Sequence, residues 1–323
     1  GPWFPVRLTG PVAWVGPVLE PGTAPCPVCL NRRLEETQPL PGTEPAGTDP
    51  LVLTAAATLT VALARRWAAG RIVGGGSADM WTLDPTAGDA PVPRVHRVVR
   101  RPGCPRCAAP PAAPADPHPP LDLRGGPAPA GSLGWRVADA AEAARRLDAL
   151  VSPLVGPVTK LTPATVGDGL HVWMADDNPA VHAPGAVRRR LRTSSSGKGT
   201  TPEEARAGAL AEALERLQGR AYGDEPRRRA RLAELPGALH PDAVQLFSPR
   251  QLAAPRSADH AKDAVPAPFD PDRVVEWSPA WSLTSGEPRW LPTAICWFGL
   301  RDASGRVADS NGCGAGTTRA EAV

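Results

Sequence analysis

Two carboxylates and a guanidinium group within residues 212–216 are the side chains of this chain best suited to bind a metal ion and a phosphate. In a helix, where successive residues turn by about 100°, Glu212 and Glu215 lie on one face with Arg216 at its edge. Carboxylates bind Mg²⁺ and cations bind phosphate, so one interpretation is a magnesium–nucleotide site. Lys198, between two glycines, is a further candidate for the nucleotide. A solvent-exposed polar helix face is the ordinary alternative.

The neighbouring sequence predicts the elements that position these residues. Thr201, Pro202 and Glu204 indicate a helix start, with an N-cap hydroxyl, a proline in the first turn and a capping-box glutamate. Gly219 is the expected end of this helix. Residues 194–200 are predicted to form a flexible, positively charged loop before it, because they contain two glycines around a lysine.

The buried side of this helix and the type of loop can also be predicted. Leu210, Leu214 and Leu217 lie opposite the two glutamates and are expected to pack into a core. The loop is not a Walker A motif, because Arg192 stands in place of the first glycine and Gly199 in place of Ser or Thr. Any nucleotide site here therefore follows another scheme.

Four of the six cysteines form two Cys-x-x-Cys pairs. Cys26, Cys29, Cys104 and Cys107 together supply four thiolates for a tetrahedral zinc ion, which leaves no open coordination position and makes the site structural. A thioredoxin-like redox pair is an alternative, but neither pair precedes a convincing helix of a βαβ unit. Disulfides are disfavoured because no secretion signal is visible.

Hydrophobic periodicity predicts an α+β chain. His96 is expected to be a packed or surface histidine, since the cysteines complete the zinc shell. In the first half of the chain, the other predicted elements are a helix over 51–69, a turn at 74–76, strands over 80–83 and 95–99, and a helix over 135–150. In the second half, they are a solvated helix face at 227–231, a loop over 249–271, and a hairpin of 274–283 and 289–298. The hairpin is expected to be anchored by Trp277, Trp281, Trp290 and Trp297.

Composition excludes some classes of partner. The 36 basic and 33 acidic residues give a net charge of +3, so no nucleic-acid footprint is expected. The apolar run 51–64 is shorter than the ~20 residues that span a bilayer, so no membrane is expected and the location is expected to be cytoplasmic. The first residues do not look like a natural start, so we expect both ends to be cut from a longer protein.

Two segments resemble the signatures of the YcaO domain. The first comprises Gly197-Lys-Gly199, Ala205 and Glu212-x-x-Glu215-Arg216, and the second is segment 310–322, which is similar to Ser-Asn-Gly…Ala-Gly-Asn-Thr…Glu-Ala. The resemblance covers residues 134–323. It implies a non-Walker ATP site in which the acids bind Mg²⁺, and an enzyme that phosphorylates a backbone amide oxygen.

The sequence departs from the family pattern at several positions. Gly208 replaces a serine and Thr317 an asparagine, and Arg136 and Ala143 stand where a lysine and a serine reach the nucleotide. The family continues beyond Val323 into a second acidic helix, so half of the metal site is expected outside this sequence. Residues 1–323 alone are therefore expected to be inactive.

The first hundred residues resemble the end of a ThiF-like domain. The resemblance rests on residues 15–30, an alanine-rich helix and residues 102–107, as in azole-forming peptide-modifying systems. We accordingly predict a zinc-closed ThiF-like remnant over 1–108, a Pro/Ala-rich linker over 109–131, and a YcaO domain over 132–323 that is incomplete at its C-terminus.

The resemblance implies an ATP- and Mg²⁺-dependent cyclodehydratase. It would convert Cys, or Ser/Thr, of a ribosomal precursor peptide to azolines, as in the biosynthesis of thiazole- and oxazole-modified microcins and thiopeptides. A ThiF-like leader-binding partner is implied, and a homodimer is considered. The alternatives are a non-catalytic module that binds a leader peptide or a partner, and a YcaO enzyme that forms thioamides or amidines.

Overall fold

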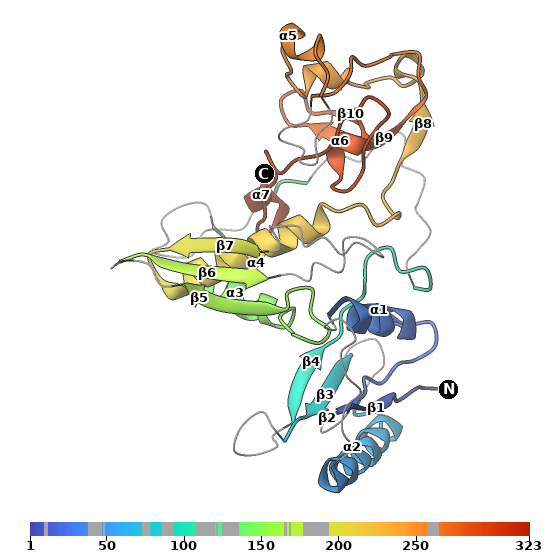
Figure 1. The fold of residues 1–323 in the computed structure, drawn as a ribbon, viewed down its shortest axis with the longest axis vertical. Helices are drawn as coiled ribbons and strands as arrows, with labels where there is room; N and C mark the ends of the chain where they lie inside the picture. Colours follow the sequence, from blue (N-terminus) through green and yellow to red (C-terminus); the bar gives the residue numbers. More distant parts are fainter. Residues whose placement is uncertain are drawn as a thin grey trace. The chain divides into compact units, whose positions relative to one another are not determined.

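The computed structural model describes residues 1–9, 12–37, 47, 49–72, 78–85, 93–107, 120, 122–124, 136–164, 167, 169–176, 194–256 and 265–323. The chain packs as two compact units. One comprises residues 1–108 and 138–213, and the other residues 109–137 and 214–323. Helix α4 (Pro202–Gln218) continues from the first unit into the second (Figure 1). The predicted domain limits at 108 and 132 stay predictions.

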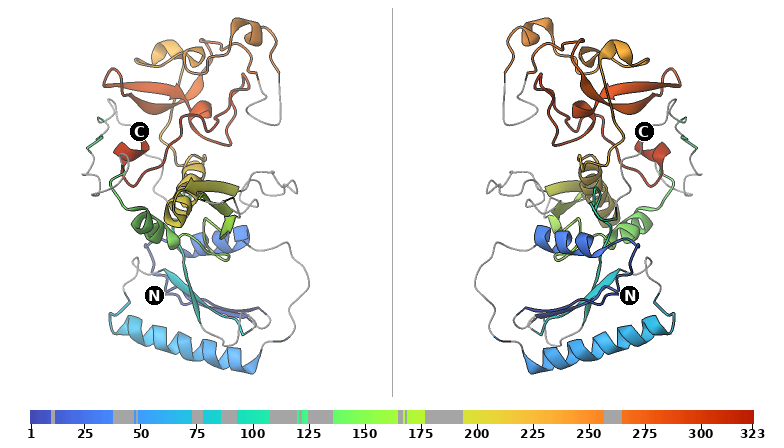
Figure 2. Two further views of the ribbon diagram at one scale, coloured as in Figure 1. Left: turned by 90° about the vertical axis from the view of Figure 1, so that its left-hand side faces the viewer. Right: turned by 90° about the vertical axis from the view of Figure 1, so that its right-hand side faces the viewer.

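The first unit contains a four-stranded antiparallel sheet with helices packed on it. Its order is β1 (Val6–Thr9), β2 (Val12–Val15), β3 (Asp79–Leu83) and β4 (Arg94–Arg97). Helix α2 (Pro50–Ala68) runs along one side of this sheet, and α1 (Pro27–Thr37) lies on the other side (Figure 2). The strands predicted over 80–83 and 95–99 and the helix over 51–69 are therefore present.

Helix α2 is longer than the apolar run 51–64 on which the membrane prediction rested. It has 19 residues and a mean hydropathy of 1.2, so by length and composition alone it is sufficient to cross a membrane. One such helix is weak evidence, because a core helix of a water-soluble protein passes the same test. Here Val52, Ala56 and Leu63 pack against the sheet, although only 17% of the apolar window is buried.

A second antiparallel sheet in the first unit positions the start of α4. Its order is β5 (Lys160–Ala164), β6 (His171–Asp176) and β7 (Ser194–Gly199). Its core includes Val158 just before β5, Ala175 of β6, and Ala209, Leu210 and Ala213 of α4. The loop predicted over 194–200 is therefore wrong, because β7 pairs with β6 along its whole length.

The second unit is built on a three-stranded antiparallel sheet. Its order is β10 (Glu287–Pro292), β9 (Val275–Ser282) and β8 (Arg228–Ala230). The predicted hairpin is present, with Trp277 and Trp290 buried and Trp281 and Trp297 partly buried, but its second strand ends at Pro292 because residues 293–296 form a helix. The helix face predicted at 227–231 is wrong, because Arg228–Ala230 pairs with β9 and Ala230 O accepts a hydrogen bond from Trp277 Nε1 at 2.9 Å.

Three short helices and one longer helix complete the described part of the chain. They are α3 (Ala140–Asp148), α5 (Pro249–Leu252), α6 (Thr293–Cys296) and α7 (Arg319–Ala322). Helix α3 begins later than the predicted start at 135, because Asp139 caps it. Helix α5 forms inside a predicted loop. The turn predicted at 74–76 and most of the predicted linker lie outside the described residues.

Candidate functional site

The start of α4 is fixed by the predicted capping box. Glu204 N donates to Thr201 Oγ1 at 3.2 Å, and Thr201 N donates to Glu204 Oε2 at 3.2 Å. Thr200 also donates to this carboxylate through both its N–H and its hydroxyl group. These hydrogen bonds lower the pKa of Glu204 and keep it ionised at the positive end of the helix.

The two glycines beside Lys198 permit close packing of β7 on α4. A Cβ atom at Gly197 would lie 1.9 Å from Ala205 O, and one at Gly199 would lie 2.5 Å from Glu204 Cβ. Side chains alternate along a strand, so Lys198 points away from the face that contacts α4, and it is exposed. The structure therefore does not bring the Lys198 side chain to the glutamates of α4 through the packed face of this strand.

Glu212 is tied to the strand in front of its helix. Its Oε2 accepts a hydrogen bond from Ser196 N at 3.0 Å, and its side chain is partly buried. This bond holds the carboxylate against β7, while Leu210 and Ala213 turn into the core. The polar face predicted for α4 is thus organised by a strand backbone at this position.

Glu215 and Arg216 of the first signature lie within electrostatic range of the second signature. Glu215 forms an ion pair with Arg216 at 3.5 Å, and its side chain is only 15% exposed. Burial raises the pKa of the Cys313 thiol, the charges of Glu215 and Asp309 raise it further, and the charge of Arg216 lowers it. These opposite effects place Cys313 within the electrostatic range of the Glu215–Arg216 pair.

The second signature also contacts the segment before α3. Glu321 accepts hydrogen bonds from Val137 N and from Thr317 N and Oγ1, the last at 2.6 Å. Burial alone would raise the pKa of Glu321, but these bonds and the charge of Arg136 outweigh it and lower the pKa. Arg136 Nη1 donates to Ala315 O at 3.3 Å, so this guanidinium lies beside the second signature.

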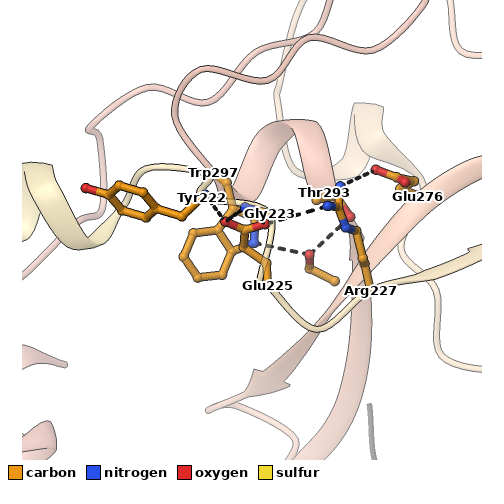
Figure 3. Close-up of polar contacts among 8 residues, drawn as sticks. Tyr222, Gly223, Glu225, Arg227, Glu276, Thr293 and Trp297 are labelled. Carbon is orange, nitrogen blue, oxygen red and sulfur yellow. Dashed lines mark hydrogen bonds and ion pairs between the residues drawn. The ribbon is translucent and has the colours of Figure 1, made fainter. Parts of the chain in front are cut away.

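A buried polar network fixes the chain that follows α4 (Figure 3). Glu225, 4% exposed, accepts hydrogen bonds from the N–H groups of Tyr222 and Gly223. Arg227 lies between two carboxylates, 3.9 Å from Glu225 and 2.9 Å from Glu276 of β9.

A second part of this network joins β9 to α6. Ser278 Oγ donates to Thr293 Oγ1 at 3.1 Å and accepts from Trp297 Nε1 at 3.2 Å (Figure 3). Both hydroxyl-bearing residues are almost completely buried. The network therefore fixes α6 on the sheet of the second unit.

The four cysteines of the two Cys-x-x-Cys pairs come together as predicted. Their Sγ atoms all lie within 4.8 Å of one another, with separations of 3.6 Å for Cys26–Cys104, 3.4 Å for Cys29–Cys107 and 3.9 Å for Cys26–Cys29. A tetrahedral zinc with Zn–S bonds of about 2.3 Å has sulfurs about 3.8 Å apart. The arrangement therefore fits zinc.

Burial and the contacts among these thiols shift their pKa values in opposite directions, upward for Cys29 and Cys107 and downward for Cys104. Burial opposes ionisation of Cys104, but backbone N–H groups of Arg106 and Cys107 and the neighbouring thiols lower its pKa to about 6. Arg101 N donates to Cys29 Sγ at 3.4 Å. The first pair lies at the start of α1, but the strands before and after this helix, β2 and β3, pair antiparallel, so it is not part of a βαβ unit, as predicted.

Other predicted residues lie apart from these sites. Among the described residues, the four cysteines are the only group of three or more potential metal ligands, and Glu212 and Glu215 are not part of it. His96 is a packed histidine, 8% exposed, bonded to Thr82 Oγ1 at 3.0 Å and Ser152 Oγ at 2.9 Å. Ala143 lies in α3.

Comparison with known proteins finds a family match in the C-terminal part of the chain. Residues 196–323 match the family described as YcaO cyclodehydratase, ATP- and Mg²⁺-binding. No curated protein matches the chain. A structure titled "Heterocyclase in complex with substrate and Cofactor" is 29% identical, with a TM-score of 0.77, and the match covers 99% of this chain and 46% of that one.

A second solved structure gives the same result. "Structure of the heterocyclase TruD" is 26% identical, with a TM-score of 0.64, and the match covers 99% of this chain and 43% of that chain. The chain thus spans less than half the length of either heterocyclase. Both signatures lie within the matched family segment, and the mixed helix and sheet fold of the whole chain matches the two heterocyclases. Residues 196–323 are thus similar to the YcaO cyclodehydratase family, and the chain as a whole is similar in fold to parts of two heterocyclases.

Proposed function

We propose that the full-length protein is an ATP- and Mg²⁺-dependent cyclodehydratase that converts Cys, or Ser/Thr, residues of a ribosomal precursor peptide to azolines. The observation that carries the proposal is the approach of the two signatures, in which Cys313 lies within electrostatic range of Glu215 and Arg216. The titles of the matched structures, which name heterocyclases, support this class of reaction.

Three residues of α4 would bind the nucleotide and its metal ion. Glu212 and Glu215 lie one turn apart and offer carboxylate oxygens, which suit Mg²⁺. Arg216 already pairs with Glu215 and would orient that carboxylate or meet phosphate. Lys198 is exposed on β7 and is assigned a nucleotide role only through the resemblance. Magnesium bound there would offset the charge on the transferred phosphoryl group.

The proposed reaction removes one water molecule from the peptide. The Cys thiol loses its proton as its sulfur bonds to the preceding carbonyl carbon. The carbonyl oxygen then takes the γ-phosphoryl group of ATP, and ADP is released. The carbon–oxygen bond breaks, phosphate leaves with that oxygen, and the amide nitrogen loses its proton to form the C=N bond. The peptide oxygen thus ends in phosphate.

Residues 1–108 are proposed to be the zinc-closed remnant of a ThiF-like domain. The support is the four-cysteine group, which joins the start of α1 to residues 104–107. A ThiF-like leader-binding partner and a cytoplasmic location belong to the same proposal.

A non-catalytic binding module is the competing hypothesis. It is favoured by the departures from the family pattern at Arg136, Ala143, Gly208 and Thr317. The two hypotheses differ in nucleotide turnover. Full-length protein incubated with precursor peptide and Mg·ATP should release one phosphate per ring formed, whereas a binding module would retain the peptide without releasing phosphate.

A further inference from the structure

A concave site lies in the second unit and is partly lined by the second signature. It has a volume of about 450 Å³, within the range of small-ligand pockets. Its walls come from the loop before α5, from α5, from β10 and α6, and from the second signature. The residues that define its chemistry are Gln245, Gln251, Leu291, Ile295, Asp309 and Asn311.

The walls of this pocket are fixed by hydrogen bonds. Gln251 and Ser248 form a reciprocal capping box at α5, with Ser248 N donating to Gln251 Oε1 at 2.9 Å. Asn311 N donates to Asp309 Oδ1 at 2.8 Å. The network of Figure 3 anchors α6, which carries Ile295. The pocket is therefore a preformed feature.

The chemistry of the walls suits a peptide and disfavours a nucleotide. No Lys or Arg is among the described residues that line the pocket, and Asp309 is its only charged side chain, so phosphate groups would meet repulsion. Gln245, Gln251 and Asn311 carry amide groups, which can pair with the N–H and C=O groups of an extended peptide. Leu291 and Ile295 offer apolar surface for a side chain.

One hydrogen-bond acceptor in the pocket wall, Gln245 Oε1, has no partner among the described residues. Gln245 Nε2 donates to Val307 O at 2.9 Å, while Gln245 Oε1 is buried. A buried acceptor without a partner is unfavourable. A peptide N–H is a donor that could satisfy it with a small movement of this side chain.

The position of the pocket links it to the proposed reaction centre. Asp309 and Asn311 line the pocket, and Cys313, two residues later, senses the charges of both Asp309 and the Glu215–Arg216 pair. A peptide held here would lie along the segment that carries Cys313, whose thiol responds to the charges of Glu215 and Arg216.

We propose that this pocket binds the residues that flank the cyclised residue of the peptide substrate, and that Asp309 makes it prefer neutral or cationic flanking residues. The inference rests on the proposed function and extends it to the substrate, since it separates a peptide subsite from the nucleotide residues of α4.

A pair of matched surface variants tests the position of the subsite. Val244 lines the pocket and is 40% exposed, whereas Val274 does not line it and is 41% exposed. In the full-length protein, Val244→Arg should raise the KM for the precursor peptide at least about tenfold and leave the KM for ATP unchanged, because only peptide binding is obstructed. Val274→Arg should change neither.

The outcomes separate this inference from the proposed function. Wild-type protein that forms rings, together with an unchanged peptide KM in Val244→Arg, would overturn the subsite and leave the function intact. Wild-type protein that forms no ring would overturn the function. In that case, binding of the fluorescein-labelled precursor peptide to the two variants still decides on the subsite, which requires weaker binding by Val244→Arg alone.

The charge preference supplies a second test. Precursor peptides with Lys or Glu next to the cyclised residue should differ in kcat/KM, with Lys favoured by about fivefold or more through attraction to Asp309. Asp309→Asn keeps the shape of the side chain and should reduce this difference to about twofold or less. Equal preference in wild-type protein, or a preference that persists in Asp309→Asn, would contradict the role of Asp309.

Discussion

At the scale of single residues, Glu212 and Glu215 share a helix face but have different partners. Glu212 accepts a hydrogen bond from the backbone of β7, whereas Glu215 pairs with Arg216 near Cys313. Neither carboxylate lies in the hydrophobic core around α4. Removal of either charge should therefore affect metal binding more than folding.

Glutamine substitutions test this assignment. Glu212→Gln and Glu215→Gln keep the side-chain shape but remove a Mg²⁺ ligand, so each should abolish ATP-dependent ring formation in the full-length protein, with little change in melting temperature. Glu203→Gln, on an exposed position of the same helix, is the control and should change stability by no more than about 0.5 kcal/mol. Wild-type turnover by both test variants would favour the solvated-face interpretation.

His96 links pH to the stability of the first unit. Ser152 Oγ accepts hydrogen bonds from Leu154 N and Val155 N, so its proton is available for His96 Nδ1, which leaves Nε2–H to donate to Thr82. Burial, and secondarily the charge of Arg94, lower the pKa of His96 below 6.5. The neutral ring is therefore the form that the folded protein favours.

The sign of the pH effect follows from this lowered pKa. Below about pH 6.5 the unfolded chain binds a proton at His96 that the folded chain does not, so stability is full above that pH and falls as the pH drops towards the folded pKa. Urea midpoints should decrease between about pH 7.5 and pH 5.5. The decrease should be smaller in His96→Gln, and an equal decrease in both proteins would contradict the assignment.

At the scale of elements, the contact between β7 and α4 positions the first signature. Gly197 lies against the backbone of α4 at Ala205 and Ala209, so any side chain there would separate strand and helix. Gly208 faces Gly197 from the helix, and a Cβ atom at Gly208 would lie 3.3 Å from Gly197 Cα. The Gly208 position therefore has more room than the Gly197 position.

Alanine substitutions at these two glycines should differ in effect. Gly197→Ala should destabilise by about 1–3 kcal/mol or more, because its Cβ would overlap helix backbone. Gly208→Ala should change stability by about 1 kcal/mol or less, because a gain in helix propensity offsets a slightly tight contact. Urea denaturation measures both, and equal effects would show that the strand does not pack closely on the helix.

Local sequence signals predicted local structure well and long-range contacts poorly. The capping box of α4, the hairpin of β9 and β10 and the cysteine group follow from residue type and spacing. The Gly-Lys-Gly segment was misinterpreted as a flexible loop, because glycine serves close packing as well as flexibility and only the partner helix distinguishes the two.

The same reasoning explains errors elsewhere. Leu214 is only partly buried whereas Leu210 is fully buried, because α4 packs mainly through small residues against the sheet. The Ser-x-x-Gln capping box at 248–251 is a sequence signal that predicts helix α5. The pocket beside it could not be predicted, because its walls come from three segments that are separate in sequence.

At the scale of the whole molecule, the chain comprises two units that we assign different roles. The first carries the four-cysteine group and the second carries the second signature and the pocket. Helix α4 belongs to both, so the first signature is divided between them. The stability of the first unit should accordingly depend on zinc, and ring formation on Mg²⁺.

Metal analysis tests the role of the first unit. Purified protein should contain about one zinc per chain, and a chelator should unfold the region of α1 and residues 104–107 while the second unit stays folded, because the metal closes only the first unit. Hydrogen exchange would locate the change. Protein without zinc, or free reactivity of all four thiols in the native state, would contradict the site.

The most direct test of the central claim is mass spectrometry of the precursor peptide after incubation with full-length protein and Mg·ATP. The account predicts that the peptide loses the mass of one water per ring, with one ADP and one phosphate released each time, and that Glu212→Gln and Glu215→Gln abolish both changes. Ring formation without ATP, or phosphate release and ring formation that persist in both variants, would contradict it.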